Sequence, residues 1–428
     1  MASSDARDLS GDAPHVERFR RDLVHAAALF STGRFSEAEN LYHELVQLQP
    51  ERWEIITRLG HLALLGNRLE EAIEHLAKAL NGNPRSHSTW NLLALAYYRK
   101  GELGSAAYCY HRLQRRQLAS TLAAMADCRP YRSNAESGGF MVELSWMVSE
   151  PLPVVLVHVN GQRVNLVIDT AAGDLVLDEA FAVAAGVRFG GREQRRFAGG
   201  RSAVVWYGHA QQLDLGRLSV YDLPVQVMPL APVFAPFFAT FPIHGVLGSA
   251  ILSQFVTTLD YHACVLRLVR LPSRQSGSTS KEKSEADVHR QEVPFWIAGR
   301  HCLVACGGPL GMPHGPVLLD TGMSGAAFAM PRSMATALGL NPPSITALEI
   351  GYGGGGGVEG QRLQMEEVCL GGFCRRDLAG IVLREFPLEL QFGFRIGGLI
   401  AHEFFRGCRL ILDFGTMHLS LVEVKPSR

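Results

Sequence analysis

The stretch VVLVHVNGQRVNLVIDTAAG, residues 154–173, decides how the larger part of this sequence is interpreted. Two apolar, β-branched runs flank Asn160 and Gly161, a pair typical of a two-residue hairpin turn, so two antiparallel strands are expected here. The second strand ends in Asp169 and Thr170, and a loop of small residues follows. The sequence therefore predicts an acidic side chain at the end of an apolar strand.

The same pattern occurs a second time, in GPVLLDTGMSG at residues 315–325. An apolar strand there ends in Asp320 and Thr321, and the offset between the two aspartates is 320 − 169 = 151. Downstream the offset settles at 153 in three matched pairs: Gly186 and Gly339, Gly245 and Gly398, and Asp260 and Asp413. A two-residue insertion after the second loop explains the difference, so the sequence predicts a duplicated unit.

A different period marks the N-terminal part of the chain. Small residues and an aromatic residue or leucine recur at intervals of 34 positions, in three sets: Gly33, Asn67 and Gly101; Ala38, Ala72 and Ala106; Tyr42, Leu76 and Tyr110. Pro50 and Pro84 close the first two units at the same interval. This pattern resembles the tetratricopeptide repeat. The resemblance implies stacked antiparallel helix pairs with a groove for peptides or extended protein segments, or alternatively a scaffold or dimerisation surface.

The β-rich part resembles a second family. Each Asp-Thr loop is followed, at nearly the same distance, by a Gly-apolar-apolar segment and then by an apolar-Asp-aromatic strand. This order is similar to that of the retropepsin and pepsin clan of aspartic proteases, over roughly residues 140–424. The resemblance implies a multidomain fold: all-α tetratricopeptide-like repeats followed by an all-β two-lobed aspartic-protease fold. Each lobe would be a small closed sheet, with the active site on a pseudo-two-fold axis.

The expected division of the chain follows from these patterns. It comprises a disordered tail (1–15), three tetratricopeptide-like units (16–120), a linker (121–137), a first lobe (138–271), a flexible polar tether (272–290) and a second lobe (291–424). Because each repeat packs only on its neighbours, we expect residues 19–120 to fold as an independent unit.

The resemblance implies that Asp169 and Asp320 form a catalytic dyad for peptide hydrolysis that uses no cofactor and no metal. Two carboxyls in close contact cannot both ionise, so they share one proton. One carboxylate then acts as general base on a water while its protonated partner polarises the scissile carbonyl. By the same resemblance Thr170 and Thr321 hydrogen-bond across the lobe interface, and Gly322 belongs to the supporting loop.

Glycine-rich stretches lie at matching places in the two predicted lobes, FAGGRSAVVWYG from residue 197 and GYGGGGGVEG from residue 351. As flaps they would close over the substrate and bond its backbone in the manner of a strand. Disordered turns, or a phosphate-binding nest for the second stretch, are the alternatives. The flap residues expected to bind substrate are Gly199, Gly200, Tyr352, Gly354 and Gly355.

Four positions depart from the family pattern. Ala171 stands where the family usually has glycine, and Ala401 where the counterpart of Gly248 is expected. A catalytically inactive, peptide-binding interaction module is therefore the alternative function, and a pure assembly scaffold is a third. Ala172 and Met323 stand where pepsin-like enzymes often carry a hydroxyl that lowers the pKa of the aspartate. We therefore expect the dyad to hold its proton to higher pH, with an optimum of roughly pH 5 to 7.

The composition limits the binding partners and the cellular compartment that we expect for this protein. The sequence has 41 basic and 41 acidic side chains, so it carries no net positive charge that would attract nucleic acid. The N-terminus is polar and has no apolar core of a signal peptide, and prolines interrupt the longest uncharged stretch. We expect a cytoplasmic protein with a peptide or protein substrate, a protein partner in the repeat groove, no nucleic acid and no membrane.

Eight cysteines are scattered over three regions. The closest pairs, Cys302 with Cys306 and Cys369 with Cys374, are not CxxC motifs, and no second paired half accompanies either of them. Free thiols in a reducing cytoplasm are therefore expected, and a metal site is not.

Overall fold

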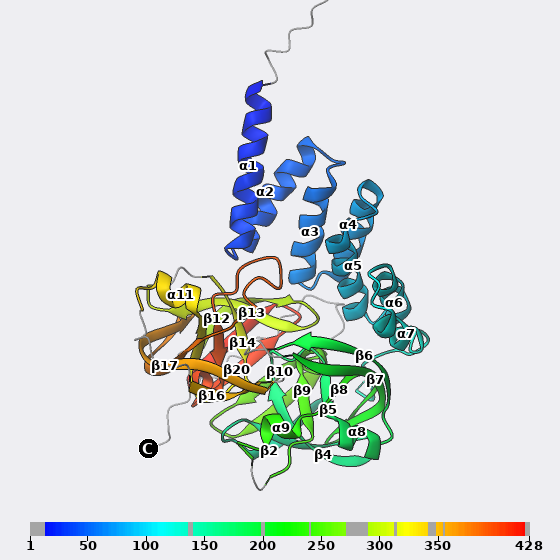
Figure 1. The fold of residues 1–428 in the computed structure, drawn as a ribbon, viewed down its shortest axis with the longest axis vertical. Helices are drawn as coiled ribbons and strands as arrows, with labels where there is room; N and C mark the ends of the chain where they lie inside the picture. Colours follow the sequence, from blue (N-terminus) through cyan, green and yellow to red (C-terminus); the bar gives the residue numbers. More distant parts are fainter. Residues whose placement is uncertain are drawn as a thin grey trace, which may run out of the picture.

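A helical array stands on a larger β-rich region in the computed structural model (Figure 1). The structure describes residues 13–135, 140–197, 202–238, 241–270, 290–311, 315–340, 348–353 and 356–423. Among these residues, no helix is both long and apolar enough to cross a lipid bilayer.

The helical array consists of seven helices. They are α1 (Ala13–Ser31), α2 (Phe35–Leu48), α3 (Trp53–Leu65), α4 (Leu69–Gly82), α5 (His87–Lys100), α6 (Leu103–Arg112) and α7 (Arg116–Ala123). The periodic alanines are fully buried, because a methyl group lets neighbouring helices approach closely. Gly33, Asn67 and Gly101 all have positive φ angles, and each lies in a turn between two helices. The 34-residue period thus records a left-handed turn that glycine and asparagine adopt with little strain.

The helical array extends beyond its expected bounds. Helix α1 begins at Ala13, inside the expected tail, and α7 ends at Ala123, inside the expected linker. Strand β1 (Arg132–Ser133) also lies in that linker and pairs with β8. The rest of the tail, residues 136–137 of the linker and residues 272–289 of the tether lie outside the described residues.

The first β region covers residues 140–270. Its elements are β2 (Met141–Val148), β3 (Val154–Val159), β4 (Gln162–Asp169), β5 (Leu175–Asp178), α8 (Glu179–Ala184), β6 (Arg188–Arg196), β7 (Ser202–Leu215), β8 (Leu218–Met228), α9 (Ala231–Phe234), β9 (Gly245–Gly248), α10 (Ser249–Leu252), β10 (Phe255–Asp260) and β11 (Val265–Arg270). The predicted Asn160-Gly161 hairpin is present between β3 and β4, with both residues at positive φ.

The second β region covers residues 290–423. Its elements are β12 (Arg290–Ala298), β13 (Cys302–Pro309), β14 (Gly315–Asp320), β15 (Phe328–Pro331), α11 (Arg332–Ala337), β16 (Leu348–Gly353), β17 (Gly356–Leu370), β18 (Phe373–Leu383), β19 (Leu399–Ala401), α12 (His402–Phe405), β20 (Cys408–Asp413) and β21 (His418–Glu423). The strand after the Asp-Thr loop starts at Leu175 in the first region and at Phe328 in the second, an offset of 328 − 175 = 153. The extra two residues therefore lie between Asp320 and Phe328.

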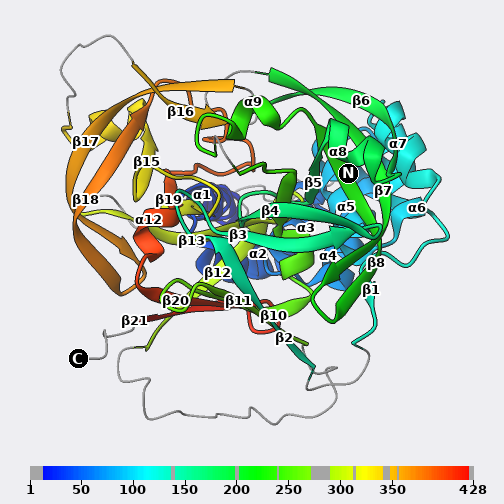
Figure 2. The ribbon, with the colours of Figure 1, turned by 90° about the horizontal axis from the view of Figure 1, so that it is seen from below.

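The strand pairings of the first β region recur in the second. In the first region β4 pairs with β3 and, in parallel, with β9; β5 pairs with β8 and β9; and β7 pairs with β3, β6 and β8. In the second region β14 pairs with β13 and, in parallel, with β19; β15 pairs with β18 and β19; and β17 pairs with β13, β16 and β18. Strands β10 and β20 pair with each other and join the two regions through a shared sheet (Figure 2).

The helical array is not a separate unit. Phe30 and Phe35 of the array pack with Phe394 of the second β region, at ring-centroid distances of 5.9 and 4.9 Å. Phe35 also packs against Trp296, and these aromatic rings belong to one apolar cluster that spans both parts. The array therefore buries apolar surface against the β region as well as between its own helices, which differs from the expectation of an independent unit.

Cys369 and Cys374 form a disulfide. They face each other across the β17–β18 hairpin, and the remaining six cysteines are free. The expectation of free thiols is therefore wrong for this pair, because the hairpin register brings together two cysteines that the sequence spacing did not identify as partners.

Candidate active site

Asp169 and Asp320 lie at equivalent places in the two β regions. Asp169 ends β4 and is in register with Gly248 of β9, while Asp320 ends β14 and is in register with Ala401 of β19. Strands β4 and β14 are apolar because they lie inside their sheets. Each strand therefore carries its aspartate from a rigid, buried support.

The two threonines that follow these aspartates link the loops to each other. The Thr170 N–H donates to Thr321 Oγ1 at 3.1 Å, and the Thr321 N–H donates to Thr170 Oγ1 at 3.2 Å. Each hydroxyl donates in turn to a carbonyl of the opposite strand, Thr170 to Leu319 at 2.7 Å and Thr321 to Ile168 at 2.9 Å. Both threonines are fully buried, so this reciprocal set of bonds fixes the two loops against each other.

Gly322 explains how closely the loops approach. A Cβ atom at this position would lie 2.4 Å from Cγ of Asp169. Asp169 therefore packs directly against the second loop, and only glycine fits there. Burial, and then the charge of the Asp169 carboxylate, raise the pKa of Asp320.

The two aspartates are not equivalent electrostatically. Asp169 Oδ1 accepts the N–H groups of Ala171 at 2.7 Å and Ala172 at 3.1 Å. Burial raises the pKa of Asp169, and these two bonds partly oppose the rise. Asp320 Oδ1 accepts the N–H of Gly322 at 3.0 Å. Burial and then the Asp169 charge raise its pKa well above the usual value. Both carboxyls therefore hold a proton to higher pH than an exposed aspartate does.

The expected flap residues are only partly described. Gly199, Gly200, Gly354 and Gly355 lie outside the described residues. Tyr352 lies in β16, where its backbone pairs with Gly357 of β17. The described parts of both hairpins, β6–β7 and β16–β17, lead into the glycine-rich turns.

A buried polar network, missed by the sequence analysis, adjoins the first loop. Asp174, five residues after Asp169, is completely buried and accepts bonds from Tyr98 of α5 at 2.8 Å and Gln226 of β8 at 2.6 Å. Its other partner is Arg300 of the second β region, at 2.6 Å. Burial opposes ionisation of Asp174, but Arg300 and the other donors lower its pKa overall. Three parts of the chain therefore meet at one carboxylate.

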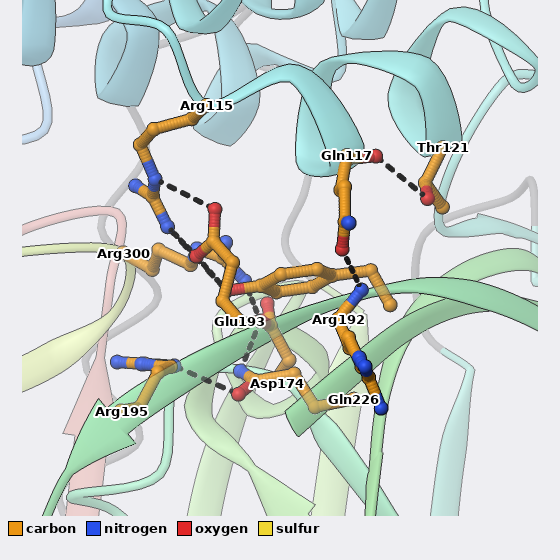
Figure 3. Close-up of polar contacts among 10 residues, drawn as sticks. Arg115, Gln117, Thr121, Asp174, Arg192, Glu193, Arg195, Gln226 and Arg300 are labelled. Atoms are coloured by element: carbon orange, nitrogen blue, oxygen red, sulfur yellow. Dashed lines mark hydrogen bonds and ion pairs between the residues drawn. The ribbon is translucent and has the colours of Figure 1, made fainter. Parts of the chain in front are cut away.

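The helical array also contacts strand β6. Arg115 forms an ion pair with Glu193, which accepts a further bond from Tyr207 at 2.9 Å (Figure 3). The Gln117 side chain accepts the N–H of Arg192 (Figure 3). The sequence analysis did not predict the Arg115–Glu193 and Gln117–Arg192 contacts, because they join residues more than 70 positions apart that share no motif.

No metal site includes the two aspartates. Among the described residues, none of the groups of His, Cys, Asp or Glu ligands close enough to hold an ion contains Asp169 or Asp320. The three groups found are Cys128, His209 and Asp222; Glu39, His43 and Glu71; and Glu367 with the disulfide-bonded Cys369 and Cys374.

The fold and the paired aspartates define a protein with an N-terminal helical array and a β-rich region built around two linked Asp-Thr loops. Residues 155–251 match the family of aspartyl proteases, and residues 29–96 match the tetratricopeptide repeat. No curated protein matches the chain. The helical array therefore contains a segment similar to tetratricopeptide repeats, and the first β region is similar to aspartyl proteases. The protease match includes Asp169 and stops before Asp320.

Proposed function

We propose that the chain is an aspartic endopeptidase in which Asp169 and Asp320 together activate the hydrolytic water. The observation that carries this proposal is the reciprocal bonding of Thr170 and Thr321, which holds the two aspartate loops together. The aspartyl protease match over residues 155–251 supports it independently. The repeated strand pairings support two lobes related by a pseudo-two-fold axis.

The dyad divides its roles unequally. Asp169, which accepts two backbone N–H groups, is the carboxylate that takes a proton from the water. Asp320, whose pKa is raised by burial and by the Asp169 charge, holds the shared proton and donates a hydrogen bond to the scissile carbonyl. The water oxygen bonds the carbonyl carbon, and Asp169 then passes the proton that it took from the water to the leaving nitrogen as the carbon–nitrogen bond breaks. No covalent intermediate is needed.

A peptide-binding module without hydrolysis is the second candidate function. Its supporting observation is that the Cys302 thiol lies 3.2 Å from the Ala171 carbonyl oxygen, so a backbone acceptor beside the dyad already has a partner. Against it, the Ala171 N–H still bonds Asp169 as the Gly322 N–H bonds Asp320. The added methyl group thus leaves the loop's bonding intact, which favours the enzyme.

The test compares Asp169→Asn and Asp320→Asn with the wild-type protein. Each variant should lose at least about a hundredfold in the rate of cleavage of denatured protein substrates, followed by mass spectrometry. Asn is nearly isosteric with Asp, so circular dichroism should stay unchanged. Asp127→Asn is the matched control, since Asp127 is exposed and outside the site. Residual activity above about a tenth in either dyad variant rules out the mechanism.

A further inference from the structure

A cavity of about 660 Å3 lies between the helical array and the β region. Its helical wall comes from α3, α5 and the turn between α6 and α7, and its β wall comes from β6, the β12–β13 turn and residues 390–393. The volume is typical of a ligand pocket. Neither the repeats nor the protease domain forms this cavity alone.

The cavity is strongly cationic. Its lining includes five arginines, Arg58, Arg99, Arg115, Arg195 and Arg300. Glu54 is the one acidic residue among the described lining residues. A concave site lined by one sign of charge concentrates the field and favours ligands of the opposite sign.

Two of these arginines already have carboxylate partners. Arg115 pairs with Glu193, and Arg300 pairs with the buried Asp174. Their charges are therefore largely compensated within the protein. Figure 3 shows these two ion pairs close together beneath the helical array, at the edge of the cavity.

The other three arginines have no ion pair with a carboxylate in the described parts of the chain. Arg58 of α3 lies over the ring of Phe30 at 4.6 Å, and Arg195 of β6 donates to the Gln226 side chain at 2.8 Å. Arg99 bonds only backbone carbonyls, and burial lowers its pKa to about 9. Positive charge held without a counter-ion is unfavourable, so an incoming carboxylate would stabilise it.

The cavity adjoins the proposed catalytic centre. Arg300 bonds Asp174, which follows Asp169 by five residues. Arg195 lies in β6, the strand that leads into the glycine-rich turn expected to cover the substrate. A substrate running along β6 would therefore pass Arg195 at the wall of the cavity.

We propose that this cavity binds acidic residues of the peptide substrate on one side of the scissile bond. Arg58 of the helical array and Arg195 of the first β region receive the carboxylates from opposite walls. The planar guanidinium matches a carboxylate with two parallel hydrogen bonds, which gives both affinity and orientation. The proposal rests on the proposed peptidase function and names its substrate class: peptides with an acidic segment beside the cleaved bond.

The test measures binding separately from cleavage. The full-length Asp169→Asn variant is titrated into a fluorescein-labelled peptide with an apolar centre and glutamates at one end, and fluorescence anisotropy is recorded. Glutamates are placed at either end in separate peptides, and glutamine versions serve as controls. The glutamate peptide of one polarity should bind at least about tenfold more tightly than its glutamine version. This preference should weaken with added salt.

Arginine variants of the same protein locate the site. Arg58→Gln and Arg195→Gln should each remove most of the preference for glutamate, because each removes the guanidinium on one wall of the cavity. Arg85→Gln, an exposed position outside the cavity, should leave it unchanged. Equal binding of glutamate and glutamine peptides overturns the proposal, and this comparison does not depend on the folding of an arginine variant. A preference that survives Arg195→Gln also overturns it, because the site would then belong to the repeats alone.

The outcomes separate this inference from the peptidase assignment. Cleavage of denatured protein that depends on the dyad, without any preference for glutamate, leaves the peptidase and removes the acidic substrate class. Binding with the glutamate preference, but without dyad-dependent cleavage by the wild-type protein, removes the peptidase and leaves an acidic-peptide site.

Discussion

The two Asp-Thr loops share one backbone plan and have different surroundings. Five residues after its aspartate, the first loop reaches Asp174, which is buried and bound by Tyr98 of the helical array and Arg300 of the second β region. At the same distance the second loop reaches Gly325, whose N–H bonds the side chain of Glu403 in its own region. At this position the first loop is therefore bonded by the helical array and by the second β region, whereas the second loop is bonded by a residue of the second β region itself.

This difference separates what the two β regions share from what they do not share. The strand, the aspartate and the threonine are retained in both halves because they build the centre itself. The position that follows is free to diverge, and in the first half it is joined to the helical array. The helical array thus bonds the first loop at Asp174, and it is linked to the second loop only through the threonine bonds.

Removal of residues 1–123 should have the largest effect, because it takes away the helical array that bonds the first loop. It would expose Trp296 and Phe394 to water and take Tyr98 away from Asp174. We expect an aggregating protein, or one that loses at least about a hundredfold in cleavage of short peptides. Size-exclusion chromatography and a peptide assay measure this, with removal of residues 1–12 as the control. A soluble product of full activity on short peptides would show that the array is independent after all.

Substitutions in the two Asp-Thr loops test how closely the loops must pack around the paired aspartates. Gly322→Ala would place a methyl group 2.4 Å from Cγ of Asp169, so the aspartate must move. We expect kcat to fall by about a hundredfold, since a shift of about 1 Å has that effect on a reacting group. Ala171→Gly removes a methyl group and should change kcat by less than about threefold. Equal effects of the two substitutions would show that the loops are interchangeable.

The buried Asp174 network should contribute more to the free energy of unfolding than the Gly325–Glu403 contact of the second loop. Asp174→Asn leaves the Arg300 guanidinium buried without a carboxylate, which should lower the free energy of unfolding by about 3 kcal/mol. Glu403→Gln keeps an acceptor for the Gly325 N–H and should lower it by less than about 1 kcal/mol. Urea denaturation of both variants measures the difference. A loss as large for Glu403→Gln would mean that the two loops are supported equally.

The pH dependence of stability sharpens the contrast further. Asp320 has a raised pKa, so its contribution to stability is present below the unfolded pKa, near 3.8, and is lost as pH rises through the folded value. Asp174 has a lowered pKa, so its contribution is present above the unfolded pKa and is lost as pH falls through the folded value. Asp320→Asn should therefore gain stability relative to wild type as pH rises, and Asp174→Asn should lose it.

Urea titrations at intervals from about pH 3 to about pH 9 follow this effect. Asp127→Asn, at an exposed position, is the control for the general pH dependence of the fold. A difference between Asp320→Asn and wild type that does not change with pH would contradict a raised pKa at Asp320.

The sequence by itself determined the elements that depend on local or periodic patterns. The 34-residue period predicted helical repeats, since glycine or asparagine at positive φ and buried alanine are required at each turn. The Asn160-Gly161 hairpin and the two-residue insertion after Asp320 were likewise readable, because turn chemistry and matched offsets are local properties. The matches to the tetratricopeptide repeat and to aspartyl proteases agree with these predictions.

Only the tertiary structure decided how these units are joined. Tyr98, Asp174 and Arg300 are polar residues with no common spacing or motif, and their bonding exists because three surfaces pack at one place. The Cys369–Cys374 disulfide likewise depends on hairpin register. Local patterns constrain backbone conformation, whereas contacts between distant segments depend on how whole surfaces fit. The duplicated aspartates were therefore visible in the sequence, and the partner that makes one loop different from the other was not.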